Sequence, residues 1–187
     1  TDPIGETEKY YTENLYRIKD IFLCYKNSHD IIVSNKKPYE SNGFITFGSF
    51  NNVSKLTRNN LETWIEILKN VPNSQLVLKS HKFSSKNTTN DFIYFFKKND
   101  VSIDRIKLLP HIKSIHGHLA MYNMIDISLD TFPFNGATTT MESLWMGVPV
   151  ITLTGKSHVS RVGTSILKNL NLEELIAENK HDYINKA

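Results

Sequence analysis

Short apolar runs alternate with amphipathic segments from Gly43 to the end of the chain. Residues 58–69 place Leu61, Trp64, Ile65 and Leu68 at i, i+3, i+4 and i+7, the spacing of one helix face. The same criteria predict further helices at 91–98, 115–124, 138–146, 159–170 and 180–187, and buried strands at 44–47, 75–79, 105–109, 125–129 and 150–153. Short strands separated by helices predict an α/β fold, with a mostly parallel sheet covered by helices on both faces.

The first 42 residues lack this alternation. They show only weak helical character around 13–21 and end in the polar stretch K-K-P-Y-E-S-N-G. We therefore expect residues 1–42 to form a linker or interlobe segment and residues 43–187 to form one ligand-binding lobe. Because the chain opens without Met, in polar sequence typical of a linker, we expect it to be a fragment of a larger protein.

The candidate site lies at one edge of the predicted sheet. In open α/β sheets, ligands bind in the loops at the carboxyl ends of the strands. The loops that follow residues 47, 79, 109, 130 and 153 are therefore expected to converge on a single edge.

The strongest signal among these loops is at residues 125–153, which predict a strand, a glycine turn, a helix and a strand. Gly136 leads into Thr138, Thr139 and Thr140 at the expected first turn of the helix. Backbone N–H groups at a helix start lack intrahelical partners and carry the positive end of the helix dipole, which favours phosphate oxygens. Glu142, one turn later, is placed to accept the hydroxyls of a ribose. A well-capped helix without a ligand is the alternative.

A second candidate is the loop at 48–57, which follows the first strand. Its glycine, serine and asparagines permit tight backbone turns, and Lys55 supplies a mobile cation able to reach a diphosphate. In a sugar transfer this cation would stabilise the charge that develops on the leaving nucleoside diphosphate, without a metal. An exposed lysine before a helix explains the same pattern.

Two histidines and two tryptophans give weaker signals. His116 and His118 lie two residues apart with no third ligand in view, so a metal site is not expected. His118 is a candidate for contact with a base or ribose, and His116 for an ordinary surface histidine. Trp64 and Trp145 are expected in the core.

Composition argues against several classes of protein. The formal charge of +3, from 22 basic and 19 acidic residues, is too balanced to favour nucleic acid or an anionic membrane as a partner. The single cysteine, Cys24, cannot form an internal disulfide, which fits a cytoplasmic protein. No apolar run reaches the roughly 20 residues that span a bilayer. The fingerprints of nicotinamide and flavin sites, P-loops and nucleophile elbows do not occur.

In sequence order, these stretches resemble one known family. The chain is similar to the C-terminal lobe of the SPINDLY/O-GlcNAc transferase family in T-D-P-I-G, G-F-I-T-F-G-S-F-N-N-V-S-K-L, V-P-N-S-Q-L-V-L-K, the run from His118 to Leu153, S-R-V-G-T-S-I-L and E-L-I-A. The resemblance covers nearly the whole chain. It implies a Rossmann-like, doubly wound parallel sheet, the C-terminal lobe of a two-lobed GT-B glycosyltransferase.

The resemblance also implies a set of donor-binding residues and no metal. Lys55 matches the family lysine that contacts the donor diphosphate, and Glu142 stands where the family has an acidic ribose ligand. Ala137 stands where animal O-GlcNAc transferases have a histidine, so that contact is lost or replaced. The full set consists of Asn52, Lys55, His118, Gly136, Ala137, Thr138, Thr139, Thr140 and Glu142.

The function implied is that of the donor-binding lobe of an inverting, metal-independent protein O-glycosyltransferase. The leading donor is UDP-GlcNAc, with Ser or Thr of an acceptor protein as the acceptor and no further cofactor. GDP-fucose is the alternative donor, because the plant SPINDLY branch shares D-I-S-L-D-T-F-P, T-T-T and E-S-L. A non-catalytic nucleotide-binding or interaction module is the alternative of another class. The N-terminal catalytic lobe and any tetratricopeptide repeats would lie outside this chain, which is not expected to be active alone, in a cytoplasmic or nucleocytoplasmic protein.

Overall fold

The centre of the molecule is a six-stranded parallel sheet with the order β3-β2-β1-β4-β5-β6. The structure is a computed structural model that describes residues 1–26 and 31–187. The strands are β1 (Ile45–Ser49), β2 (Ser74–Lys79), β3 (Ile106–Leu109), β4 (Ile127–Leu129), β5 (Val150–Leu153) and β6 (Ile176–Ala177). The order reverses between β1 and β4, which is the switch point of a doubly wound sheet and confirms the predicted fold class.

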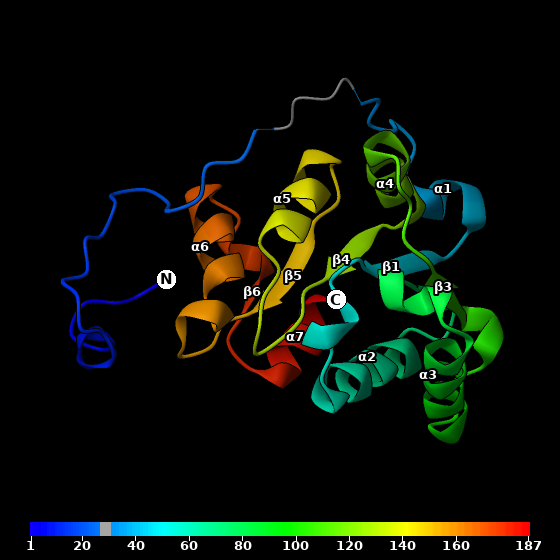
Figure 1. Ribbon diagram of the computed structural model, residues 1–187. Coiled ribbons are helices and arrows are strands. Elements are labelled where there is room, and N and C mark those ends of the chain that lie inside the picture. Colours follow the sequence, from blue (N-terminus) through cyan, green and yellow to red (C-terminus); the bar gives the residue numbers. More distant parts are fainter. Residues whose placement is uncertain (27–30) are drawn as a thin grey trace.

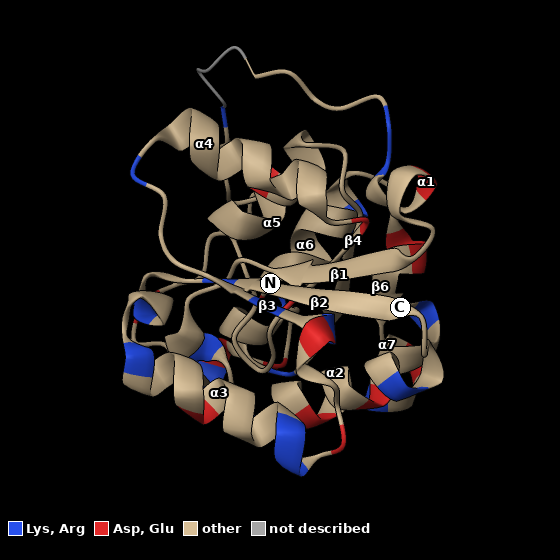
Figure 2. Ribbon diagram, turned by 90° about the vertical axis from the view of Figure 1, so that its right-hand side faces the viewer, with Lys and Arg blue, Asp and Glu red and all other residues tan. Residues whose placement is uncertain are grey.

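Helices cover both faces of the sheet (Figures 1 and 2). One face carries α2 (Arg58–Asn70), α3 (Lys86–Lys98) and α7 (Lys180–Lys186). The other face carries α4 (Ile115–Ala120), α5 (Thr138–Trp145) and α6 (Val162–Asn169), and the short α1 (Pro38–Asn42) precedes β1. This two-sided cover follows from parallel strands, since each crossover must pass over one face to return the chain to the same edge.

The core divides into two apolar clusters because strand side chains alternate between the faces. In β2, Leu76 and Leu78 join the larger cluster with Trp64, between the sheet and α2. Val77, which points the other way, joins a smaller cluster with Tyr122 near α4. The indole N–H of the fully buried Trp64 donates to the hydroxyl of Tyr183 in α7, at 3.4 Å.

Several sequence predictions about local structure need correction. The weak helix predicted around 13–21 is absent, because this stretch is mostly exposed and has little core to pack against. The helix predicted at 115–124 ends at Ala120 and continues as a 3₁₀ turn, Met121–Met124. Trp145, expected in the core, is 48% exposed, and its ring meets the edge of Tyr25. The two-residue β6 was not predicted.

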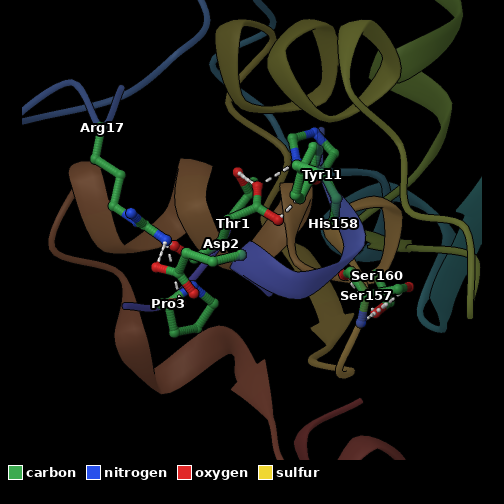
Figure 3. Close-up of polar contacts among 9 residues, drawn as sticks. Thr1, Asp2, Pro3, Tyr11, Arg17, Ser157, His158 and Ser160 are labelled. Carbon is green, nitrogen blue, oxygen red and sulfur yellow. Dashed lines mark hydrogen bonds and ion pairs between the residues drawn. The ribbon is translucent and has the colours of Figure 1, made fainter. Parts of the chain in front are cut away.

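The N-terminal segment runs along the outside of the domain beside α6 (Figure 1). Its Asp2 carboxylate accepts hydrogen bonds from the imidazole of His158, at 2.6 Å, and from the hydroxyl of Tyr11, at 3.0 Å (Figure 3). Arg17 Nε donates to the backbone carbonyl of Asp2 at 2.7 Å. The bond to His158 attaches the segment to the loop after β5, whereas the bonds of Tyr11 and Arg17 lie within the segment. The part of the predicted linker at 27–30 lies outside the described residues.

The buried carboxylate of Asp130, at the end of β4, organises the edge where the sheet reverses. It is 1% exposed. Its Oδ1 accepts the N–H groups of Thr131, at 2.8 Å, and Gly136, at 2.6 Å, and its Oδ2 accepts the hydroxyl of Thr152, at 2.7 Å. Burial raises the pKa of Asp130 to about 6, although these hydrogen bonds act to lower it. Asp130 therefore ties β4, β5 and the turn at 131–136 together.

The start of α6 approaches this carboxylate closely. A Cβ atom added at Gly163 would lie 2.3 Å from Thr152 Oγ1 and 2.7 Å from Asp130 Oδ2. The Gly163 N–H also donates to Asn135 Oδ1, at 3.3 Å. Only glycine fits between the helix and the Asp130 network.

We expect Asp130 to give the free energy of unfolding a distinct pH dependence. Because its pKa in the folded protein, about 6, lies above the ordinary value of 3.8, the folded protein retains a proton that the unfolded chain releases. The stability contribution of Asp130 is therefore largest below about pH 4 and falls by about 3 kcal/mol as the pH rises through about 6. Urea unfolding of the wild type and Asp130→Asn from about pH 4 to about pH 7 measures this difference. A difference that does not change with pH would contradict the expectation.

The Gly163→Ala variant should be destabilised by about 2 kcal/mol, since the added methyl group overpacks the contact with Thr152 and Asp130. Ser165→Ala, on the same helix, is the matched control and should change stability by less than about 0.5 kcal/mol. Chemical unfolding of both variants at one pH tests the close approach. Equal stabilities for the two variants would show that α6 can move away without cost.

Candidate functional site

The candidate site occupies the carboxyl edge of the sheet at the switch point between β1 and β4. The loop after β1 and the turn after β4 meet there, as predicted. The hydroxyl of Thr139 donates to Asn51 Oδ1 at 2.8 Å, which joins the start of α5 to the first loop. The two strongest sequence signals therefore lie side by side.

The start of α5 is open to a ligand. Its N-cap residue, Ala137, has no side-chain acceptor, and the first-turn threonines do not cap the helix. The alternative of a well-capped helix is therefore wrong, and within residues 1–26 and 31–187 no side chain caps the first N–H groups of α5. Thr138 is exposed at this end, whereas the side chain of Thr140 is buried. An uncapped helix start of this kind favours an anion.

Gly136 forms the tight turn that leads into α5. A Cβ atom at this position would lie 2.6 Å from Thr139 Oγ1 and 2.7 Å from Thr140 Oγ1. Its N–H group donates to Asp130, as described above. Gly136 therefore shapes the site by lacking a side chain.

Lys55 lies at the end of a short 3₁₀ turn, Val53–Lys55, with its ammonium turned toward the second loop. Its Nζ donates to the carbonyl of Asn135 at 2.8 Å and stands 4.2 Å from the ring centre of Phe134. Burial lowers the pKa of Lys55, while the charge of Asp130 acts to raise it. The alternative of an ordinary exposed loop lysine does not fit this half-buried position.

Asn52 has a structural contact in this loop. Its side-chain Oδ1 accepts the N–H of Ser54 at 3.0 Å and caps the 3₁₀ turn that carries Lys55. The side chain is exposed. A contact between Asn52 and a donor stays a prediction.

His118 and Glu142 meet in a hydrogen-bonded cluster beside the start of α5. His118 Nε2 lies 2.8 Å from Glu142 Oε2, which also accepts the hydroxyl of Tyr122 at 3.2 Å. The ammonium of Lys79, at the end of β2, bonds to the other ring nitrogen of His118. Burial lowers the pKa of Lys79 to about 8, with Glu142 acting in the opposite direction. The cluster thus joins the carboxylate of Glu142, the imidazole of His118 and the ammonium of Lys79 at one end of the site.

Three residues of this edge, Asp130, Asn51 and Tyr122, were missed as site residues by the sequence reasoning. Lys79 and Asp130 both lie where a strand ends at the carboxyl edge; this position points Lys79 toward the site and could have marked Asp130 as well. Asn51 and Tyr122 gave no such signal, because their partners, Thr139 and Glu142, are distant in sequence. Each missed residue forms a hydrogen bond with a predicted site residue: Asn51 with Thr139, Tyr122 with Glu142 and Asp130 with Gly136.

The part of the chain that the structure describes holds neither a metal-binding cluster nor a membrane-spanning helix. Within residues 1–26 and 31–187, no group of three or more His, Cys, Asp and Glu side chains is arranged to hold a metal ion. Over the same residues, no helix combines the length and the apolar character needed to cross a bilayer.

Related structures support the fold. The structure of a mutant of the O-GlcNAc transferase of Thermobaculum terrenum superimposes with a TM-score of 0.73 and 35% identity, over 78% of this chain and 28% of that chain. The C-terminal domain of a group 1 glycosyl transferase of Francisella tularensis gives a TM-score of 0.50 at 14% identity, over 81% of this chain and 92% of that chain. The second likeness concerns the fold alone. Together they confirm the predicted GT-B type of glycosyltransferase fold.

Sequence relatives give the family. The probable UDP-N-acetylglucosamine–peptide N-acetylglucosaminyltransferase SPINDLY of Solanum lycopersicum is 42% identical over 186 residues, which are 100% of this chain and 20% of the relative. The protein of the same name from Arabidopsis thaliana is 42% identical over 179 residues, 96% of this chain and again 20% of the relative. The chain thus spans 20% of the length of these curated relatives. The model of glycosyl transferase family 41 matches residues 21–187, so the chain belongs to this family.

Proposed function

We propose that this chain is the donor-binding lobe of an inverting protein O-glycosyltransferase, with UDP-GlcNAc as the donor. The observation that carries the proposal is the convergence of Lys55, the open start of α5 and the His118–Glu142 pair on one edge of the sheet. The ammonium and the helix start suit a diphosphate. The carboxylate and the imidazole suit the nucleoside.

Lys55 and α5 would act on the leaving group. During transfer the acceptor oxygen bonds to the anomeric carbon, the bond from that carbon to the diphosphate breaks, and the hydroxyl proton passes to a base that we place in the N-terminal lobe. Negative charge then grows on UDP. The Lys55 ammonium has three N–H donors, and the described residues occupy one of them through Asn135 O. The other two can reach phosphate oxygens, so we assign charge stabilisation to Lys55 and the α5 dipole rather than to a metal.

The relatives favour GlcNAc over fucose as the transferred sugar. The tomato and Arabidopsis proteins are both named as N-acetylglucosaminyltransferases that act on peptides. We further propose that the whole protein has an N-terminal catalytic lobe, transfers the sugar to a Ser or Thr of another protein, and is cytoplasmic; the 20% share of the relatives that this chain spans leaves room for that lobe. Within the chain, residues 43–187 would bind the donor, and residues 1–42 would lead to the other lobe.

Calorimetric titration of the purified chain with UDP and with GDP tests the donor. We expect UDP to bind with a dissociation constant in the micromolar to millimolar range and to bind equally well with and without magnesium, because Lys55 and α5 supply the positive charge. Preferential GDP binding would instead indicate fucose transfer. Absence of binding for both nucleotides would favour the non-catalytic interaction module.

Lys55→Met should weaken UDP binding by roughly tenfold to a hundredfold, since a charge-assisted hydrogen bond contributes about 1.5–3 kcal/mol. The fold should be retained, because the methionine side chain can still pack on Phe134. Lys69→Met is the matched control, as this exposed lysine lies at the opposite end of α2. The same titration gives both affinities. Equal UDP affinities for the two variants would remove Lys55 from the diphosphate site.

A further inference from the structure

Lys79 has no part in the proposed function, yet its ammonium is placed at the nucleoside end of the site. The residue is 4% exposed. Its Nζ lies 4.8 Å from the ring centre of Phe50, and that ring packs against Tyr122 at 4.7 Å. A buried ammonium is costly unless it is paired, so its contact with His118 requires an explanation.

The hydrogen bonds around His118 specify which ring nitrogen carries the proton. An ammonium only donates, so Nδ1, which faces Lys79, must accept. A carboxylate only accepts, so Nε2, which faces Glu142 at 2.8 Å, must donate. Both contacts require the same neutral tautomer of His118, with its proton on Nε2.

This tautomer also orients the carboxylate of Glu142. Its Oε2 receives Nε2–H of His118 and the hydroxyl of Tyr122. Burial, together with the charge of Glu142, raises the pKa of Tyr122 well above its ordinary value, so the phenol keeps its proton and stays a donor. Among the described residues, Oε1 receives no hydrogen bond. One oxygen of Glu142 is held, and the other remains an acceptor.

We propose that Lys79 is a positioning residue that fixes the Nε2–H tautomer of His118, so that Glu142 presents Oε1 to a ribose hydroxyl of the donor. The identity of the ligand rests on the proposed function, whereas the tautomer does not. Lys79 thus does not touch the ligand but acts through two hydrogen bonds, from Lys79 to His118 and from His118 to Glu142. Because both ring nitrogens of His118 are engaged, the imidazole presents its ring face to the nucleoside.

Nitrogen NMR of the unliganded, isotope-labelled chain tests the tautomer, with the His118 signals assigned by their loss in His118→Asn. We expect a protonated Nε2 and an unprotonated Nδ1 in the wild type. In Lys79→Met no ammonium faces Nδ1 any longer, so a fraction of the chains should carry a proton on Nδ1 while Nε2–H still donates to Glu142. UDP affinity should fall by roughly tenfold, the effect of one lost hydrogen bond. Lys82→Met, an exposed lysine in the turn after β2, is the control and should leave both readouts unchanged.

A protonated Nδ1 in the wild type would overturn the proposal, whatever the variants do. An Nδ1 that stays unprotonated in Lys79→Met would do the same, provided that circular dichroism shows the variant to be folded. A protonated Nδ1 in Lys79→Met with unchanged UDP affinity would overturn the link to the ribose. A wild-type chain that shows the expected tautomer but does not bind UDP would count against the proposed donor and leave the role of Lys79 in orienting Glu142 supported.

Discussion

The site depends on the buried carboxylate of Asp130. A carboxylate removed from water is costly unless donors surround it, and the chain supplies them from the turn at 131–136 and from β5. Satisfying Asp130 therefore fixes this turn. The loop at 131–136 then sets the direction of α5 and places the carbonyl of Asn135 within hydrogen-bond distance of the Lys55 ammonium. The need to satisfy one buried group thus places both halves of the proposed anion site.

Helix α5 sets the spacing between the two ends of the site. Its start faces the first loop through the Thr139 hydroxyl, and Glu142 follows Thr138 by four residues. At 1.5 Å per residue, this separation is about 6 Å along the axis. A single rigid helix thus holds the N–H groups proposed to bind the diphosphate and the carboxylate proposed to accept the ribose at a fixed distance, and the two ends cannot shift independently.

Periodicity predicted β1 to β5 and the long helices, because these depend on which face each residue presents to a core. The start of α5 and the proposed role of Lys55 could be predicted as well, because they depend only on neighbouring residues. Glycine permits a tight turn, the threonines follow it at the start of the helix, and lysine supplies a positive charge. Long-range pairing could not be predicted. Lys79 and Asp130 are charged residues at strand ends, and their burial depends on partners far along the chain. The prediction that Trp145 lies in the core was wrong for a related reason, because the sequence of α5 does not show which of its apolar residues faces the sheet.

The two lysines of the edge are suited to different tasks. Burial lowers the pKa of both, and in each case a carboxylate opposes the shift, Asp130 for Lys55 and Glu142 for Lys79. Lys55 bonds to a neutral backbone carbonyl, which it can exchange for a phosphate oxygen at little cost. Lys79 bonds to an imidazole that is itself held by Glu142, so moving it would disrupt two hydrogen bonds. In the proposed function, the arrangement separates a cation that stabilises the charge of a leaving group, Lys55, from a cation that keeps the surrounding groups in place, Lys79.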